Sequence, residues 1–260
     1  TDMNSMFSGT ALFNQDIGNW DTSSVTYMSS MFANTTFNQD IGNWDVSNVL
    51  RMDYMFADSN FNQPIGNWDV SNVTSDELPA ENEYCCFVYG MTHMFSNSPF
   101  NQDISDWDVS SVTAMSSMFY NTPFNQDISN WDVGNVRMFG HMFENTPFNQ
   151  DLSQWNIENL GRIESDCLEG IFDNSGLTYE NYDNVIISWS QTNFLNDTSS
   201  WGYCKTIGAE GVYFCNSEDA RQILINNGWT INDAGYNCDT ASVDDLEITS
   251  FSIYPNPTKE

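Results

Sequence analysis

The chain has few positive charges. Its 260 residues include six Lys or Arg, two His and 36 Asp or Glu, which gives a formal net charge of −30. Nucleic acid is excluded as a partner, because binding to phosphates requires clustered cations. The same repulsion excludes an anionic membrane surface. A charge of this size keeps a protein in solution and favours cationic partners.

Long apolar runs and catalytic motifs are missing as well. No run of 18 apolar residues occurs, so membrane insertion is not predicted from these residues. The sequence has no H-E-x-x-H, G-x-S-x-G, P-loop or dinucleotide fingerprint. The many carboxylates leave a glycosidase formally open. We nevertheless predict a protein that is not an enzyme and that holds no cofactor.

One nine-residue segment recurs six times. It reads Phe-Asn-Gln-Asp-Ile-Gly-Asn-Trp-Asp from Phe13, and near-copies begin at Phe37, Phe61, Phe100, Phe124 and Phe148. The steps are 24, 24, 39, 24 and 24 residues, so the longest step is one period plus a 15-residue insertion, 75–89. A fixed period in this range predicts a solenoid, in which each unit buries its apolar side against its neighbours.

Within one unit, residues 25–48, most apolar residues recur at every third position. The step of two at Trp44-x-Val46 predicts a very short strand, and Met28-x-x-Met31-Phe32 predicts a single helical or 3₁₀ turn. Strands of successive coils would stack in parallel at about 4.8 Å. We expect the six repeated tryptophans to form one buried column, and the methionines to fill gaps in a narrow core.

The repeat unit resembles that of a known family. The pattern W-D-V-S-N-V-T-x-M-x-x-M-F, followed by F-N-Q-D-I, resembles the repeat of BspA-type leucine-rich-repeat surface proteins, including the related repeats of mycoplasma surface lipoproteins. The resemblance covers residues 1 to about 175. It implies a cell-surface or secreted protein that binds other macromolecules and has no catalytic centre. We therefore predict a right-handed, leucine-rich-repeat-like solenoid of about seven 24-residue repeats over residues 1–175, with short parallel strands and helical turns.

A terminal module, residues 176–238, breaks the repeat pattern. Residues 178–189 are predicted to form a helix with Thr178 as N-cap. Its apolar face consists of Tyr182, Val185, Ile186 and Trp189. A second helix is predicted to begin after Asn216 or Ser217 and to end at Gly228. This small α-helical module would cap the apolar edge of the last coil.

The chain ends with an acidic linker, 239–250, and a short motif. The segment Ser-Ile-Tyr-Pro-Asn-Pro-Thr at 252–258 resembles the opening of the C-terminal sorting domain of the type IX secretion system of Bacteroidota. The alternative is a Pro-rich tail. The resemblance implies that residues 251–260 begin a sorting domain, with the motif Tyr254, Pro255, Asn256 and Pro257. It also implies contact with the secretion machinery and an extracellular or outer-membrane-surface location in a Gram-negative bacterium.

Further segments are expected on both sides of the chain. The first residues align with the middle of a repeat, so a signal peptide and further repeats are expected before Thr1, and the rest of the sorting domain after Glu260. In the linker, Asp239-Thr240-Ala241 resembles an O-glycosylation motif of Bacteroidota proteins, with Thr240 as acceptor. The alternative is an ordinary linker threonine.

Six cysteines in a chain with a secretion motif indicate disulfides rather than a zinc site. Cys215 and Cys238 flank the second predicted helix, and we expect them to be bonded. Cys167 and Cys204 are a second candidate pair. An adjacent pair lies in the insertion and could form a vicinal disulfide or reach another part of the chain: Cys85 and Cys86.

The repeat also places carboxylates in columns. One column is expected to contain Asp21, Asp45, Asp69, Asp108 and Asp132. Carboxylates about 5 Å apart repel by about 0.8 kcal/mol per pair in water. We expect each Asp to accept backbone N–H bonds in its own turn. The alternative is calcium, which takes six to eight oxygen ligands and would join successive coils.

Recognition is expected where the repeats differ. The variable sites hold Tyr or Arg, which are favoured at interfaces: Tyr27, Arg51, Tyr54, Tyr84, Tyr89, Tyr120 and Arg137. His93 and His141 share one repeat position, and we expect them to be solvent-facing. The Asn-Gln pairs, such as Asn38-Gln39, are expected to hydrogen-bond along the stack.

Two functions fit the sequence. The first is a secreted or surface-displayed binding or adhesion protein that recognises protein or glycan through the solenoid surface. The second is a structural subunit or stalk segment of a larger cell-surface assembly. A variable aromatic patch on a monomer favours the first, and exposed apolar ends favour the second.

Overall fold

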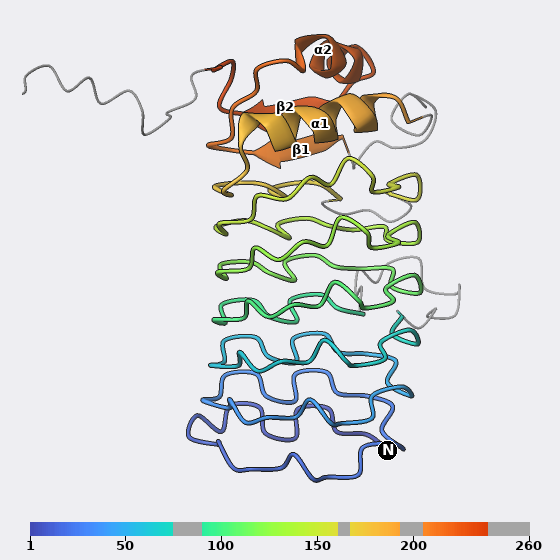
Figure 1. The fold of residues 1–260 in the computed structure, drawn as a ribbon, viewed down its shortest axis with the longest axis vertical. Coiled ribbons are helices and arrows are strands. Elements are labelled where there is room, and N and C mark those ends of the chain that lie inside the picture. Colours follow the sequence, from blue (N-terminus) through green and yellow to red (C-terminus); the bar gives the residue numbers. More distant parts are fainter. Residues whose placement is uncertain (75–89, 161–166, 193–204, 239–260) are drawn as a thin grey trace, which may run out of the picture.

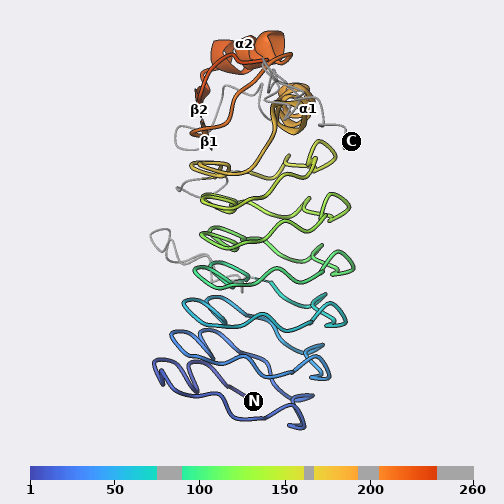
Figure 2. The ribbon, with the colours of Figure 1, turned by 60° about the vertical axis from the view of Figure 1, so that its left-hand side comes forward.

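The computed structural model describes residues 1–74, 90–160, 167–192 and 205–238. Figure 1 shows a stack of coils that runs from the N-terminus to a layer of helices and strands at the other end. The regular elements of the described residues are α1 (Tyr179–Ser190), β1 (Thr206–Ala209), α2 (Glu218–Asn226) and β2 (Thr230–Asp233). The turned view in Figure 2 shows the same coils as nearly parallel layers. Neither helix is long and apolar enough to cross a membrane.

Successive coils are joined by hydrogen bonds between equivalent backbone positions. Met28 N–H donates to the Arg51 carbonyl at 3.0 Å, and isolated parallel bridges pair Tyr27 with both Asp2 and Arg51. The strand predicted at Trp44–Val46 is wrong. There the Trp44 N–H bonds to Ile41 within its own coil, and the indole Nε1 donates to the Ile17 carbonyl of the preceding coil at 3.1 Å. A side chain therefore makes the contact between coils at this point.

Each coil turns at two residues with positive φ. In the second coil these are Ser30, at 57°, and Asn34, at 58°. The helical or 3₁₀ turn predicted for Met28–Phe32 is wrong, because a left-handed residue interrupts helical backbone. The Met31 N–H instead closes a turn on the Met28 carbonyl at 3.2 Å. Asn and Asp tolerate this backbone well, and they fill most of the second position: Asn34, Asp58, Asn97, Asn121, Asn145 and Asn174.

Aromatic rings and methionines fill the core of the stack. Phe95 lies 3.8 Å from Phe100 of the same coil and 5.9 Å from Phe119 of the next coil, measured between ring centroids. Five of the six repeated tryptophans are only 2–4% exposed, as expected. The expectation is wrong for Trp20, which is 37% exposed. Within the described residues, the first coil has a neighbouring coil on one side only.

A ladder of asparagine side chains links the coils on another edge. The Asn38 N–H donates to Asn14 Oδ1 at 2.9 Å, and Gln39 Nε2 donates to the same oxygen at 3.0 Å. The pattern repeats up to Asn149, whose Oδ1 accepts from the Thr178 N–H and from Asn181 Nδ2, both at 2.9 Å. The predicted amide ladder is present, and it continues onto α1.

The terminal module closes the stack. The predicted apolar face of α1 is buried, and Thr178 is its N-cap residue without a side-chain capping bond. α2 begins after Ser217 and is followed by Gly228 at φ 85°, as the sequence predicts. β1 and β2 pair in parallel, with Thr206 opposite Thr230. The bridge from Leu168 to Ile207 continues the coil ladder into the module.

One predicted disulfide is confirmed. Cys215 and Cys238 are bonded. Cys167 is also disulfide-bonded. Its candidate partner, Cys204, lies outside the described residues, as do Cys85 and Cys86. The same holds for Thr240 and for the motif 254–257. The assignment to the leucine-rich-repeat class of right-handed solenoids stays a prediction.

Candidate functional site

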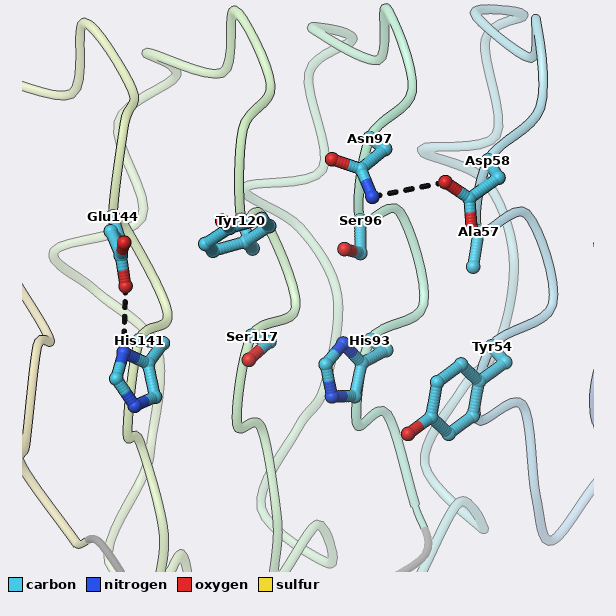
Figure 3. A pocket seen from close by; sticks show the side chains of 10 residues that line it. All are labelled: Tyr54, Ala57, Asp58, His93, Ser96, Asn97, Ser117, Tyr120, His141 and Glu144. Atoms are coloured by element: carbon cyan, nitrogen blue, oxygen red, sulfur yellow. Dashed lines mark hydrogen bonds and ion pairs between the residues drawn. The ribbon is translucent and has the colours of Figure 1, made fainter.

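One face of the stack carries a cavity of about 510 Å³. Its lining comes from four successive coils, as Figure 3 shows. The residues are Tyr54, Ala57, Asp58, His93, Ser96, Asn97, Ser117, Tyr120, His141 and Glu144. They occupy three repeat positions: the first left-handed turn residue, the residue three positions later and the second left-handed residue.

The left-handed turn brings a residue out of the core. Met91 and Met94 are fully buried, whereas His93 between them has φ 56° and lines the cavity. Ser117 and His141 occupy the same position in the next two coils, at 54° and 59°. Because the core positions on either side are nearly constant, this position can vary without disturbing the core.

In three of the four coils, one of the first two lining positions holds a large residue and the other a small one. The coil with His93 has the small Ser96 three residues later, and the next coil has the small Ser117 followed by the large Tyr120. Figure 3 shows Ser117 between the two imidazoles, with the Tyr120 ring beside it. Two coil steps span about 10 Å. A gap therefore opens over Ser117, between His93 and His141.

A ring stack forms one wall. The Tyr54 and His93 rings lie nearly parallel, 14° apart, with centroids separated by 4.5 Å. Burial lowers the pKa of His93, and the nearby His141 acts in the same direction. Burial also raises the pKa of Tyr54 above its ordinary value of 10.0. At neutral pH this wall is therefore an uncharged aromatic surface.

The opposite wall is a histidine held by a carboxylate. His141 Nδ1 and Glu144 Oε2 lie 2.6 Å apart. The imidazole also rests on Gly170 of the next coil, where a β-carbon would overlap Nδ1. Gly170 has φ 61°, so both its backbone and its lack of a side chain suit this place. The glycine and the carboxylate together fix the orientation of the ring.

A chain of amides runs along the rim and ends at a carboxylate. Asn121 Nδ2 donates to Asn97 Oδ1 at 2.9 Å, and Asn97 Nδ2 donates to Asp58 Oδ1 at 3.0 Å. Among the residues that the structure describes, the lining thus has two carboxylates, Asp58 and Glu144, and no Lys or Arg. The cavity therefore offers aromatic surface, hydrogen-bonding groups and negative charge, which suits a cationic or neutral ligand better than an anion.

The structure brings together only part of the predicted interaction set. Tyr54 and Tyr120 line the cavity. Arg51 lies over the Tyr27 ring at 5.7 Å, and neither Arg51 nor Arg137 is among the lining residues. Two further predicted residues, Tyr84 and Tyr89, lie outside the described residues.

The sequence missed several cavity residues. His93 and His141 were expected to face solvent, but both are partly buried in the cavity wall. Asp58, Ser117 and Glu144 were not singled out. The available signal was the comparison of the first left-handed position with the residue three later. Once both positions are aligned, the sequence shows that the large residue moves from the first to the second of them in the coil of Ser117.

The aspartate column makes local turns. Asp45 Oδ1 accepts the Ser47 N–H at 3.0 Å and the Ser47 hydroxyl at 2.6 Å, and these bonds lower the pKa of Asp45. Equivalent backbone bonds reach Asp21, Asp69, Asp108 and Asp132. These are the turn bonds expected from the sequence. Within the described ranges, no group of three or more His, Cys, Asp or Glu is arranged to hold a metal. The calcium alternative stays a prediction.

Comparison with known families adds to this geometry. A family model described as "Mycoplasma protein of unknown function, DUF285" matches residues 1–84 and 84–175. The chain belongs to the DUF285 family. The match covers the coils, and it agrees with the resemblance of the repeat to mycoplasma surface lipoproteins. Comparison with curated proteins and with solved structures gives no match.

Proposed function

We propose that this DUF285 chain is a non-enzymatic binding or adhesion protein that recognises a protein or glycan through the face of its coils. The cavity centred on Ser117 carries this proposal. It is built from positions where the repeats differ, on a scaffold where they agree. Variation on a constant scaffold is typical of repeat proteins whose coil face is a binding surface.

The chemistry of the lining fits recognition. Its polar groups already have partners, such as Glu144 with His141 and Asp58 with Asn97. Such pairs hold side chains in one geometry, which reduces the entropy lost when a ligand binds. The Tyr54–His93 stack adds a rigid aromatic surface.

A binding experiment tests this function. The chain would be screened against immobilised extracellular proteins and glycans, and each hit would be measured again with His93→Ala and with Tyr120→Ala. We expect both variants to weaken binding at least tenfold. Tyr213→Ala is the matched control, because Tyr213 is an exposed aromatic residue of the terminal module, outside the cavity. Equal binding by all three variants would contradict the proposal.

We also propose that the protein is exported by the type IX secretion system and is displayed or released at the outer-membrane surface. The support is the motif at 252–258, which follows a polar linker. In a Bacteroidota host, removal of residues 251 onward from the full-length gene should leave the protein inside the cell. Normal secretion of that truncated protein would disprove the route.

We also propose a second candidate, a structural subunit or stalk segment of a larger surface assembly. The first described coil exposes three large apolar side chains: Met6 at 51%, Leu12 at 89% and Trp20 at 37%. Another chain, or further repeats of the same chain, stacked on this coil would cover them. Sedimentation at increasing concentration tests this, since association through this end should be abolished by Leu12→Glu.

A further inference from the structure

The gap over Ser117 lies where a third ring would continue the stack of Tyr54 and His93. Tyr54 and His93, in successive coils, stack with their centroids 4.5 Å apart. Ser117 is next at this repeat position and has no ring, and His141 follows. Two coil steps leave about 10 Å between equivalent points. A flat group stacked on one imidazole at about 3.5–4.0 Å would fit in this space, with the other imidazole about 6 Å away.

The charged residues around the gap determine which kind of flat group it favours. Glu144 lies at one side and Asp58 along the rim, while no Lys or Arg of the described residues belongs to the lining. Because His93 is held uncharged by burial, it does not balance these carboxylates at neutral pH. The formal net charge of −30 adds long-range attraction for a cation. A flat, cationic group therefore matches both the shape and the charge.

In the terminal module, an aromatic ring and a carboxylate already hold a guanidinium group. The guanidinium carbon of Arg221 lies 3.9 Å from the centroid of the Phe214 ring. Its Nε and Nη2 donate to the two oxygens of Asp233 at 2.8 and 3.0 Å. Within this chain, a guanidinium is thus held by a ring face and a carboxylate, which are the two kinds of group that the gap presents.

We propose that the gap over Ser117 binds the guanidinium group of an arginine on a cationic protein partner, an inference that rests on the proposed binding function. The planar group lies between the His93 and His141 imidazoles, beside Tyr120. Its N–H groups donate to the carboxylate of Glu144 and to the rim acceptors. Lysine fits less well, because an ammonium is a compact point charge that neither stacks nor bonds bidentately. A neutral sugar makes no use of the two carboxylates' charge.

The two histidines of the chain provide a local probe, because both line the cavity. We would follow their imidazole proton resonances by NMR, assigned with His93→Asn and His141→Asn, during titration with N-acetyl-arginine methylamide. We expect saturable shifts of both resonances. The matching citrulline compound has the same shape without the charge, and we expect it to bind at least tenfold more weakly.

Matched variants test the position. Ser117→Tyr places a ring in the gap, at a repeat position where Tyr54 shows that a tyrosine is accommodated. It should weaken binding of the arginine compound at least tenfold. Ser5→Tyr is the control, because Ser5 has the same φ of 54° two coils before Tyr54 and lies outside the cavity. It should change binding less than twofold. Glu144→Gln removes the carboxylate charge with little change of shape and should also weaken binding at least tenfold, which covers the case in which Ser117→Tyr does not fold.

The outcomes separate this proposal from the proposed function. The arginine proposal is overturned if the arginine compound shifts neither resonance, or if citrulline binds equally well. It is also overturned if methyl glucoside gives the saturable shifts instead, which would make the occupant a sugar and leave the binding function intact. A partner found in the screen and bound equally by Ser117→Tyr and Ser5→Tyr would place recognition elsewhere. If the screen finds no partner but the arginine compound shifts the resonances, the result counts against the proposed binding function. It does not count against the arginine site.

Discussion

The described residues of the coils, within 1–175, and of the terminal module, within 176–238, bury similar side chains but are held together by different bonds. In the coils, each contact recurs at equivalent positions. For example, Trp107 Nε1 donates to the Ile65 carbonyl, as Trp44 does to Ile17. In the module the principal bonds do not recur at equivalent positions. One example is the Arg221–Asp233 ion pair.

The coils and the terminal module are therefore stabilised in different ways. A coil depends on neighbours that resemble it, so its stability is approximately a sum of similar interface terms. The module depends on a few particular groups. Asp183 is buried and accepts the N–H groups of Cys215 and Asn216, and the disulfide joins Cys215 to Cys238. Substitutions should therefore act gradually along the coils and abruptly in the module.

The largest effect is expected inside the coils. Trp107→Ala removes a side chain that is 3% exposed and leaves a cavity, so the free energy of unfolding should fall by about 3–5 kcal/mol. Trp20→Ala, at the same repeat position in the first coil, should cost clearly less, because Trp20 is 37% exposed. Urea unfolding followed by tryptophan fluorescence measures both. Equal losses would show that position in the stack does not matter.

The next effect belongs to the module. Replacing Cys215 and Cys238 together by Ser opens a loop with a sequence separation of 23 residues. On the chain-entropy model this costs about 3 kcal/mol. Hydrogen exchange should show faster opening of residues 206–238 with unchanged protection of residues 91–160. Faster exchange throughout the coils would mean that the two regions unfold as one unit.

Asn149 is one of the side chains that join the two regions. Asn149 Oδ1 accepts two hydrogen bonds from the start of α1, so Asn149→Ala should cost about 1–3 kcal/mol and separate module unfolding from coil unfolding. Asn101→Ala is the matched control, because its Oδ1 accepts the equivalent bonds from Asn125 and Gln126 within the coils. It should cost a similar amount without separating the transitions. Two-step calorimetric unfolding in both variants, or in neither, would contradict this difference.

The smallest effect is a pH dependence within one coil. Burial raises the pKa of Asp53 above 3.8, and the hydrogen bond from the Ser29 hydroxyl opposes this only in part. An acid with a raised folded pKa favours the protonated folded state. Its contribution to stability therefore falls as pH rises from 3.8 through the raised pKa. Asp53→Asn should remove that part of the decline in unfolding free energy between pH 4 and pH 7.

Asp45→Asn is the control for this measurement. Its pKa is lowered by the Ser47 bonds, so its contribution is present above 3.8 and is lost as pH falls through the lowered pKa. Asn156 occupies the same repeat position and accepts the Glu158 N–H at 3.0 Å, so an asparagine preserves the turn. The same slope change in both variants would rule out burial of Asp53 as the cause.

The sequence predicts features that depend on repetition or on one local signal. The buried residues of the coils follow from the 24-residue period. α1 follows from its apolar face, and α2 from its cap residue and Gly228. The Cys215–Cys238 bond follows from the positions of the two cysteines around α2. Each of these features is encoded within one unit or one short segment.

The missed features depend on backbone conformation. A residue such as Ser30 shows no sign of a positive φ, so the segment from Met28 to Phe32 was expected to be helical. The cavity requires side chains from four coils at three repeat positions, two of which hold Ser117 and Tyr120. The repeat spacing predicts which residues lie in the same column. The direction in which a residue with positive φ points its side chain is known only from the folded structure.

The hydrogen bonds between coils have a mechanical consequence, because they run along the stack from one coil to the next (Figure 1). Tension applied between the two ends would load the coil interfaces in series, so the weakest interface would give way first. Each 24-residue coil that detaches extends to about 80 Å, in place of about 4.8 Å in the stack, and the coil with the 15-residue insertion frees 39 residues. The molecule would thus lengthen in discrete steps under a steady pull, one of them longer than the others, like an extensible tether.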